Sequence, residues 1–448
     1  MPLTSLRALT RDASPAGAVA ACCVPLIFLY PNQQPGSTVA GVHGDLSDLA
    51  ILALVVLALL RGAREGFAPL VPGRAVWLFT IAFLALILVS LSWARLADPS
   101  YSLTGNLVSA LKFVEYALLA PAATLALRHR RDRAIFYWAV ALWSAFLTLI
   151  AVLQFLGHVS TVYGHHPNQR EPSWLDEHDL AAFSGAALAF ALAALLTRGG
   201  RRIAIVGGVS GALGMALAAA LDSVGGLWVA AFASVGMARA RLGVSLRRAV
   251  AVLLLCGLVT VGAVSLRSSS IAAFLRFLGL EKETAATTTN VQSYAHRTLL
   301  GYIGLEIWLD HPIVGVGWQE SKRPHSFEPH LASARRLFGS SEPPEAFPSR
   351  QHMWGVQNGI IQTLADLGLV GLALLVALLV AVVRVVLAVA LRGPPSVLHE
   401  ALLLTGWLVI GFAVFVGTGL IPGVTVDAQL WLAIGLAVAL RHSLAPDG

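Results

Sequence analysis

Long apolar runs dominate the chain, and short polar or charged stretches separate them. A helix that crosses a bilayer needs about 20 mostly apolar residues. Runs of that kind cover residues 15–31, 45–61, 75–94, 103–127, 134–157, 179–197, 202–221, 223–240, 247–266, 359–384, 400–418 and 424–441. The pattern therefore predicts an all-α fold, a polytopic membrane protein of about twelve transmembrane helices.

One long segment, residues 267–353, interrupts this series between the ninth and tenth runs. Within it a helix is predicted over SYAHRTLLGYIGLEIWLD, where Leu299, Ile303 and Ile307 share one face. We therefore expect three parts: helices one to nine in 1–266, a partly helical periplasmic loop domain in 267–353, and the last three helices in 354–448.

Composition and charge support a membrane protein and suggest its orientation. The chain is 57% hydrophobic and only 12% charged, with a mean hydropathy of +0.74, whereas soluble domains carry about 25% charged residues. Connections on one side of the predicted bundle hold Arg61, Arg64, Arg74, Arg128, Arg130, Arg131, Arg133, Arg198, Arg201, Arg202, Arg239, Arg241, Arg247, Arg248, Arg392 and Arg441. The short loops on the other side hold only Arg95 and Arg170. By the positive-inside rule we expect both termini to be cytoplasmic. The net charge of +7 is then explained by the arginines of the cytoplasmic connections. The expected partner is the lipid bilayer and not nucleic acid.

Two charged residues fall inside a predicted span. Lys112 and Glu115 lie near the middle of the fourth helix, where charge is costly unless it is paired. At positions i and i+3 they share a face of the helix. An ion pair within the bundle is the favoured interpretation, and a direct role in substrate binding is the alternative.

Polar residues also gather at two turns. Asp222 and Ser223 lie between the seventh and eighth helices, where we expect turn and cap contacts. The loop after the fifth helix contains His158, His165, His166 and His178. Their spacing matches no helical pair of metal ligands, so no metal site is expected. Arg170 is the one arginine of that loop, and it contacts either a substrate or a lipid headgroup.

The stretch MWGVQNGIIQTLADLGLVGL (353–372) leads from polar sequence into the tenth helix. Arg384 is the expected inner end of that helix. Gln357 precedes it by 27 residues (384 − 357), roughly 40 Å of helix, whereas the hydrocarbon core is about 30 Å thick. Gln357 and Asn358 are therefore expected at or just above the outer membrane surface, where capping of the helix is one explanation for them.

Three stretches resemble motifs of the O-antigen ligases and O-antigen polymerases. RTLLGYIGLEIWLDHPIVGVG (297–317) resembles the family's pattern of Arg, a helix, Asp-His-Pro and a Gly-x-Gly end. QNGIIQTLADLGLVG (357–371) is similar to its motif of His-Asn, nine residues and Gly-x-x-Gly. REPSWLDEHDLAAF (170–183) is similar to its Arg-x-x-Gly and Asn-x-x-Ala opening of the next helix. In two places the chain departs from the family: Gln357 stands where His is usual, and Val224 follows Ser223 where Arg is frequent.

The resemblance implies a glycosyltransferase of the bacterial inner membrane with its active site on the periplasmic side. Its donor would be a glycan on a polyprenyl diphosphate, and its acceptor a hydroxyl of a lipid-linked sugar, another glycan or a protein. It implies no metal, nucleotide or other cofactor. Arg170 and Arg297 are the expected diphosphate ligands, because a guanidinium binds phosphate oxygens bidentately and keeps its charge.

The resemblance also places Gln357 and Asn358 at the catalytic position. A glutamine amide cannot take a proton from the acceptor, whereas histidine is the usual base near neutral pH. His352, five residues upstream of Gln357, is the nearest titratable residue and is the expected base. A solvated loop histidine is the alternative interpretation of His352.

Ligase and polymerase share these motifs, so both remain open. A polytopic transporter is a further alternative that twelve helices also suit, although the two halves of the chain show no similarity to each other. A family member that has lost catalysis is the last alternative, and Gln357 is the residue that suggests it.

Overall fold

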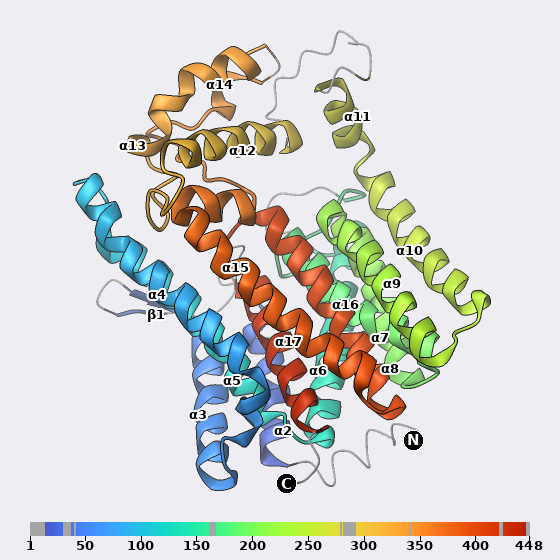
Figure 1. Cartoon of the computed structure of the whole chain (residues 1–448). Coiled ribbons are helices and arrows are strands. Elements are labelled where there is room, and N and C mark those ends of the chain that lie inside the picture. Colours follow the sequence, from blue (N-terminus) through green and yellow to red (C-terminus); the bar gives the residue numbers. More distant parts are fainter. Residues whose placement is uncertain are drawn as a thin grey trace.

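The computed structural model describes residues 14–29, 37–39, 42–160, 167–277, 280, 293–340, 342–420 and 424–444. Long helices run side by side in a bundle, and α11 to α14 lie above one end of it (Figure 1). The described residues also form two short strands, β1 (Ser37–Val39) and β2 (Val42–Gly44), which pair antiparallel. The predicted helical fold is therefore confirmed, with this one hairpin added.

The longer helices follow the apolar runs of the sequence. They are α2 (Pro15–Ile27), α3 (Leu46–Glu65), α4 (Arg74–Ala97), α5 (Leu103–Ala126), α6 (Arg130–Phe155), α7 (Glu177–Thr197), α8 (Arg201–Ala218), α9 (Leu221–Leu242), α10 (Leu246–Leu266), α15 (Gly359–Arg392), α16 (Pro395–Thr418) and α17 (Val424–His442). Among the described residues, ten helices are long and apolar enough to cross a membrane. The two remaining predicted spans, 15–31 and 424–441, contain α2 and α17.

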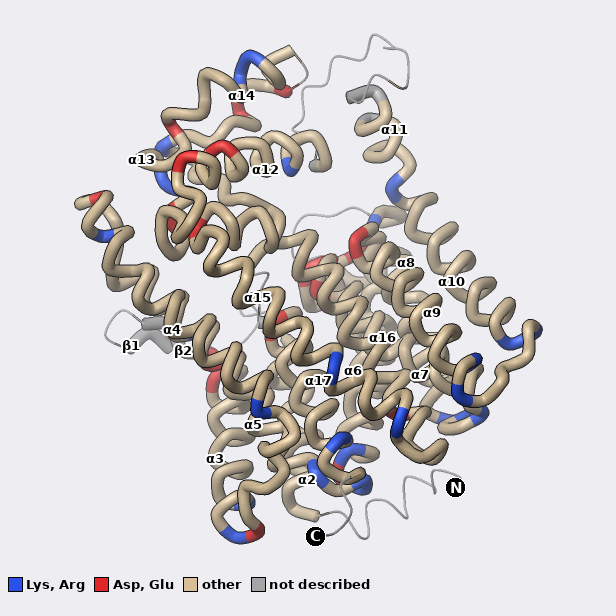
Figure 2. Tube along the Cα trace, in the orientation of Figure 1, with Lys and Arg blue, Asp and Glu red and all other residues tan. Residues whose placement is uncertain are grey.

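The shorter elements lie mainly between α10 and α15. They are η2 (Ala68–Gly73), α11 (Ser268–Phe277), α12 (Ser293–Asp310), α13 (Pro324–Phe327), η3 (Glu328–His330), α14 (Leu331–Phe338) and η4 (Pro344–Ala346). Leu299, Ile303 and Ile307 of α12 are buried in one apolar cluster, which confirms their predicted common face. Many Lys and Arg residues lie at the end of the bundle opposite α12 (Figure 2).

Helix α7 is buried on every side and forms the centre of the bundle. Small residues bring its neighbours close: a Cβ added at Gly207 of α8 would lie 2.7 Å from the carbonyl oxygen of Ala187. Helices α8, α9 and α16 all pack against α7. Because a close-packed interior leaves little room for movement, the start of α7 is held in a fixed place at the α12 end of the bundle.

Helix α15 is broken at Gly368, whose φ of 64° and ψ of −163° suit glycine alone. The stretch that follows α12 fills the break with its backbone. Four hydrogen bonds join the two segments: Leu369 N to Pro312 O (2.9 Å), Val370 N to Ile313 O (3.1 Å), Val316 N to Ala365 O (2.9 Å) and Gly317 N to Asp366 O (2.8 Å). These bonds satisfy backbone groups that the break would otherwise leave unpaired in a dry environment. Two of the stretches that carry the family resemblance are therefore bonded directly to each other.

The close approach of these segments depends on two glycines and one carboxylate. A Cβ added at Gly315 would collide with the backbone of Asp366, and one added at Gly368 would collide with Ile313 O. The buried carboxylate of Asp366 accepts hydrogen bonds from the backbone N–H groups of Gln319 (3.2 Å) and Ser321 (3.1 Å). Asp366 thus holds the turn that follows the inserted segment.

Helix α15 continues past Arg384 and ends at Arg392. The prediction that Arg384 marks its inner end is therefore wrong. The run from Val385 to Leu391 is apolar and contains no helix breaker, and the chain first meets one at Gly393.

The predicted pair inside α5 is confirmed. Lys112 Nζ lies 3.6 Å from Glu115 Oε2, and it also pairs with Asp48 of α3. All three side chains are partly exposed, at 22% to 25%. The ammonium of Lys112 lies between two carboxylates at the contact between α3 and α5, which supports the interpretation of an ion pair within the bundle.

We expect Gly368→Ala to destabilise the protein by about 2–4 kcal/mol, because it adds backbone strain and a steric clash. The measurement is the apparent melting temperature in detergent. Gly257→Ala in α10 is the matched control, since a Cβ there meets no atom within 4 Å. Equal melting temperatures for the two variants would contradict the importance of the break.

Candidate functional site

Arg297 of α12 links four parts of the chain. Its Nε donates a hydrogen bond to Gln357 Oε1 (3.1 Å), its Nη1 donates to Gly417 O (3.0 Å), and its Nη2 lies 2.9 Å from His178 Nε2. Helix α12 thereby meets the segment before α15, the end of α16 and the start of α7. A predicted diphosphate ligand is therefore the residue on which these elements converge.

The two polar residues before α15 have different structural roles. Asn358 is the N-cap of α15, and its Oδ1 accepts hydrogen bonds from Ile360 N (3.1 Å) and Ile361 N (3.0 Å). Gln357 instead uses its side-chain oxygen to hold Arg297. Capping thus accounts for Asn358, while the contact with Arg297 brings Gln357 into the candidate site.

Two further arginines lie near Arg297. Arg170 Nη2 pairs with Glu177 Oε1 at 3.1 Å. Arg267 follows α10, is buried, donates from Nε to Ala219 O (3.1 Å), and stacks over the ring of Tyr294. Burial and the positive charges of Arg170 and Arg297 lower the pKa of Arg267 from its ordinary value, yet a guanidinium stays charged near neutral pH. The sequence reading did not single out Arg267, because it lies in no motif.

His178 and Asp222 complete the group around Arg297. His178 Nδ1 lies 3.0 Å from Asp222 Oδ2, and the two side chains are 15% and 12% exposed. Asp222 Oδ1 also accepts a hydrogen bond from Ser223 N (2.8 Å). Asp222 therefore makes the turn contact expected from the sequence in addition to its contact with His178. Sequence reasoning assigned neither residue to the site, because nothing in the sequence shows that the starts of α7 and α9 lie side by side.

The expected base lies away from this group. The imidazole of His352 is exposed and stacks on Trp354, with ring centroids 5.9 Å apart. Trp354 in turn meets the edge of the His296 ring. Among the described residues, the His352 side chain has no polar contact with Arg297, Gln357 or Asn358. His165 and His166 lie outside the described residues.

Comparison with known proteins identifies no family. No protein-family model matches the chain, and no curated protein matches it either. A function for this protein therefore has to be inferred from its own contacts and cavities.

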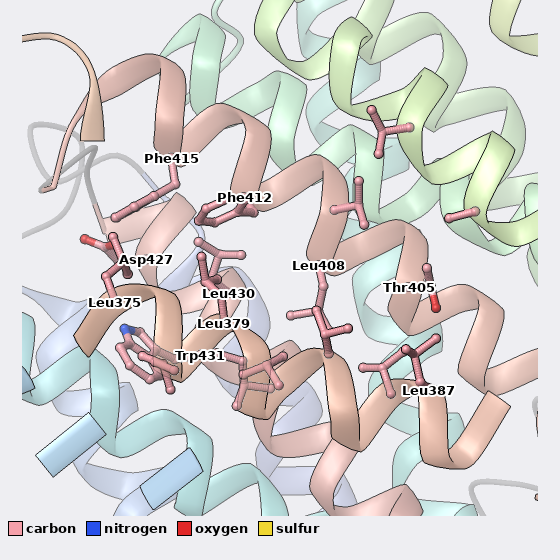
Figure 3. A pocket seen from close by; sticks show the side chains of 18 of the residues that line it. Leu375, Leu379, Leu387, Thr405, Leu408, Phe412, Phe415, Asp427, Leu430 and Trp431 are labelled. Atoms are coloured by element: carbon pink, nitrogen blue, oxygen red, sulfur yellow. The ribbon is translucent and has the colours of Figure 1, made fainter. Parts of the chain in front are cut away.

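An apolar cavity of about 580 Å³ lies within the bundle and includes residues of α9, α15, α16 and α17 (Figure 3). Its lining is apolar except for Thr405 and Asp427. Along α16 the lining runs from Thr405 to Phe415, and Phe415 is two residues from Gly417, the acceptor for Arg297. A Cβ added at Gly359 would lie 2.9 Å from Phe415 O, so this end of the cavity meets the start of α15. The lining of the cavity thus reaches within one helical turn of Gly417, the residue that Arg297 contacts.

Helices α7, α9 and α15 all begin at this end of the bundle, and the start of a helix favours negative charge. The first turn of α7 carries Glu177 and Asp179, and that of α9 carries Asp222. The first turn of α15 carries no acidic residue. Of these three starts, the start of α15, beside Gln357 and Arg297, is thus the one without an acidic residue.

Glu171 is buried next to this group, and neither of its carboxylate oxygens has a hydrogen-bond partner among the described residues. Burial and the nearby charge of Glu177 raise the pKa of Glu171 from 4.5 to about 7. A carboxyl whose folded-state pKa is raised contributes stability below its unfolded pKa and loses that contribution as the pH rises through its folded pKa.

We therefore expect Glu171→Gln to raise the melting temperature relative to the parent at about pH 8, by roughly 1–2 °C, with little gain at about pH 5. The exposed Glu345→Gln is the control and should show no such difference. A gain for Glu171→Gln that is the same at both pH values would contradict this account.

Proposed function

We propose that the protein transfers a glycan from a polyprenyl diphosphate to an acceptor hydroxyl at the α12 end of the bundle. The observation that carries this proposal is that Arg297 contacts the end of α16, the helix whose residues from Thr405 to Phe415 line the apolar cavity. A lipid diphosphate has a doubly charged head on a long isoprenoid chain. It needs cationic donors next to an apolar space, and this end of the bundle offers both.

The chemistry of the transfer makes specific demands on the head-group site. Negative charge develops on the diphosphate as it leaves the sugar, so fixed donors that face it stabilise the transition state. A guanidinium has five N–H groups, and Arg297 uses three of them in its present contacts. The other two can donate to phosphate oxygens while Gln357 and Gly417 keep the guanidinium in place.

The surrounding charges support the same role. Arg170 and Arg267 lie close enough to affect each other electrostatically, and Arg297 also affects Arg267. Three arginines close to one another favour a multivalent anion over a single carboxylate. The acceptor would approach from the side of α11 to α14, since the bundle occupies the other side (Figure 1).

The orientation in the membrane is part of the proposal. Arginine and lysine collect at the end of the bundle opposite α12 (Figure 2), which favours a cytoplasmic location for that end. The transfer site and the 267–353 segment would then face the periplasm of a bacterial inner membrane, with both termini in the cytoplasm. Ligation and polymerisation differ only in the acceptor hydroxyl.

We expect Arg297→Ala to lower glycan transfer by about 10²–10³-fold, as the loss of a fixed donor does elsewhere. Arg297→Lys should also be impaired, because one ammonium cannot reach Gln357, Gly417 and His178 together. Arg170→Ala should reduce transfer as well. The measurement is surface glycan in a deletion strain that expresses each variant at equal membrane levels.

Arg350→Ala is the matched control for these variants. Its guanidinium is 74% exposed and pairs with Glu328 at 2.8 Å, within the same segment as Arg297. It should keep full transfer. Normal glycan in both Arg297→Ala and Arg170→Ala would show that the arginine site is not the transfer site.

Deletion of the protein should change the lipid-linked glycans of its host in a way that identifies the acceptor. Accumulated lipid-linked polymer indicates a ligase, and accumulated single repeat units indicate a polymerase. Extraction and analysis of the glycolipids makes this measurement. A glycolipid profile unchanged by the deletion would contradict both.

A further inference from the structure

The arrangement of His178 fixes the position of its proton. A guanidinium only donates hydrogen bonds, so His178 Nε2, 2.9 Å from Arg297 Nη2, accepts one. A neutral imidazole then carries its proton on Nδ1. That nitrogen lies 3.0 Å from Asp222 Oδ2. Nε2 therefore bears the lone pair and points into the arginine site, while Nδ1 lies in close electrostatic contact with the Asp222 carboxylate, at an angle that makes no hydrogen bond.

Asp222 is itself held in place. Ser223 N donates to its Oδ1, and Gly417 packs so closely that an added Cβ would overlap the carboxylate. Gly417 also supplies the carbonyl that Arg297 contacts. A carboxylate fixed in this way selects the tautomer of the imidazole and stabilises its charge once a second proton arrives.

Several charged groups face the imidazole from the elements packed around it. Asp222 belongs to α9 and Arg297 to α12, and Asp176 caps its own helix and lies within electrostatic range. The wider charges at this site are Glu177, Asp179, Arg170 and Arg267. Asp222 is the acidic group in contact with the ring, and it lies on the side opposite the lone pair.

We propose that His178, oriented by Asp222, is the general base of the transfer, in place of the histidine that Gln357 replaces. This inference rests on the proposed function. The acceptor oxygen forms a bond to the anomeric carbon of the donor sugar. The bond from that carbon to the diphosphate oxygen breaks, and its electron pair leaves with the diphosphate. The acceptor proton passes to His178 Nε2, and Asp222 stabilises the imidazolium that results.

The contact with Arg297 makes this base dependent on the donor. When no glycan donor is bound, the Arg297 guanidinium donates a hydrogen bond to the lone pair of Nε2, so that lone pair cannot accept a proton from the acceptor. A bound diphosphate draws the guanidinium toward its own oxygens, since a charged acceptor binds it more strongly than a neutral imidazole does. Nε2 is then free for the acceptor hydroxyl.

His178→Gln separates a base from a residue that merely positions Arg297. A glutamine amide oxygen reaches the place of Nε2 and still accepts a hydrogen bond from the guanidinium, but it takes no proton. For a base we expect transfer to fall by about 10²–10⁴-fold. The parent rate should also decline at acid pH, because a protonated imidazole accepts no proton, and the residual rate of the variant should lack that decline. Asp222→Asn should lower kcat more than it raises KM for the donor.

The assay uses membranes that contain the full chain, with donor lipids extracted from a deletion strain and acceptor from the same host, over a range of pH. His325→Asn removes an exposed imidazole on α13 and should match the parent. Equal elution profiles in detergent establish that the variants fold. His352→Asn tests the rival base, and loss of the acid decline in that variant alone would overturn our proposal.

Two failures of the experiment have different meanings. If the parent transfers glycan and His178→Gln keeps its rate and its acid decline, only the assignment of the base is wrong. If the parent transfers nothing from the lipid extract to any acceptor of the host, the proposed function is wrong and the base assignment falls with it.

Discussion

The backbone interlock between the segment after α12 and the broken helix α15 is the constraint on which the site depends. Gly368 opens the helix, and residues 312–317 supply the hydrogen-bond partners that the break requires. Because these residues directly follow α12, the interlock ties that helix to the end of the bundle. Arg297, on α12, is thereby placed over the starts of α7 and α15. Without the interlock, the packing of α12 would rest on its apolar face alone.

Arg297 in turn couples elements that lie far apart in the sequence. Its three contacts reach α7, the segment before α15 and the end of α16. Each partner is fixed by its own helix: His178 by the buried α7, Gln357 by the Asn358 cap, and Gly417 by its packing on Asp222. A guanidinium held on three sides loses little freedom when it binds a further anion, which is the physical basis of preorganisation. The packed helices of the bundle and the segments at their ends together produce this arrangement.

The fold was largely predictable from the sequence, and the candidate site only in part. Apolar runs of about 20 residues identify membrane helices because the thickness of the bilayer sets their length. The break at Gly368 lies inside such a run, and the hydropathy of a run carries no information about its backbone dihedral angles. Arg297 was found because it opens a motif. His178 and Asp222 lie in separate turns, and only the packing of α7 against α9 reveals their contact.

The interlock also has a consequence for the order in which the protein is made. Residues 312–317 leave the ribosome before α15 does, so their carbonyl and N–H groups already exist when the broken helix is synthesised. The first nine residues of α15 (359–367) form too short a helix to span the hydrocarbon core unaided. The segment that hydrogen-bonds to the end of this short helix, residues 312–317, has already been synthesised at that point. The segment that fills the break is thus synthesised before the helix that contains the break.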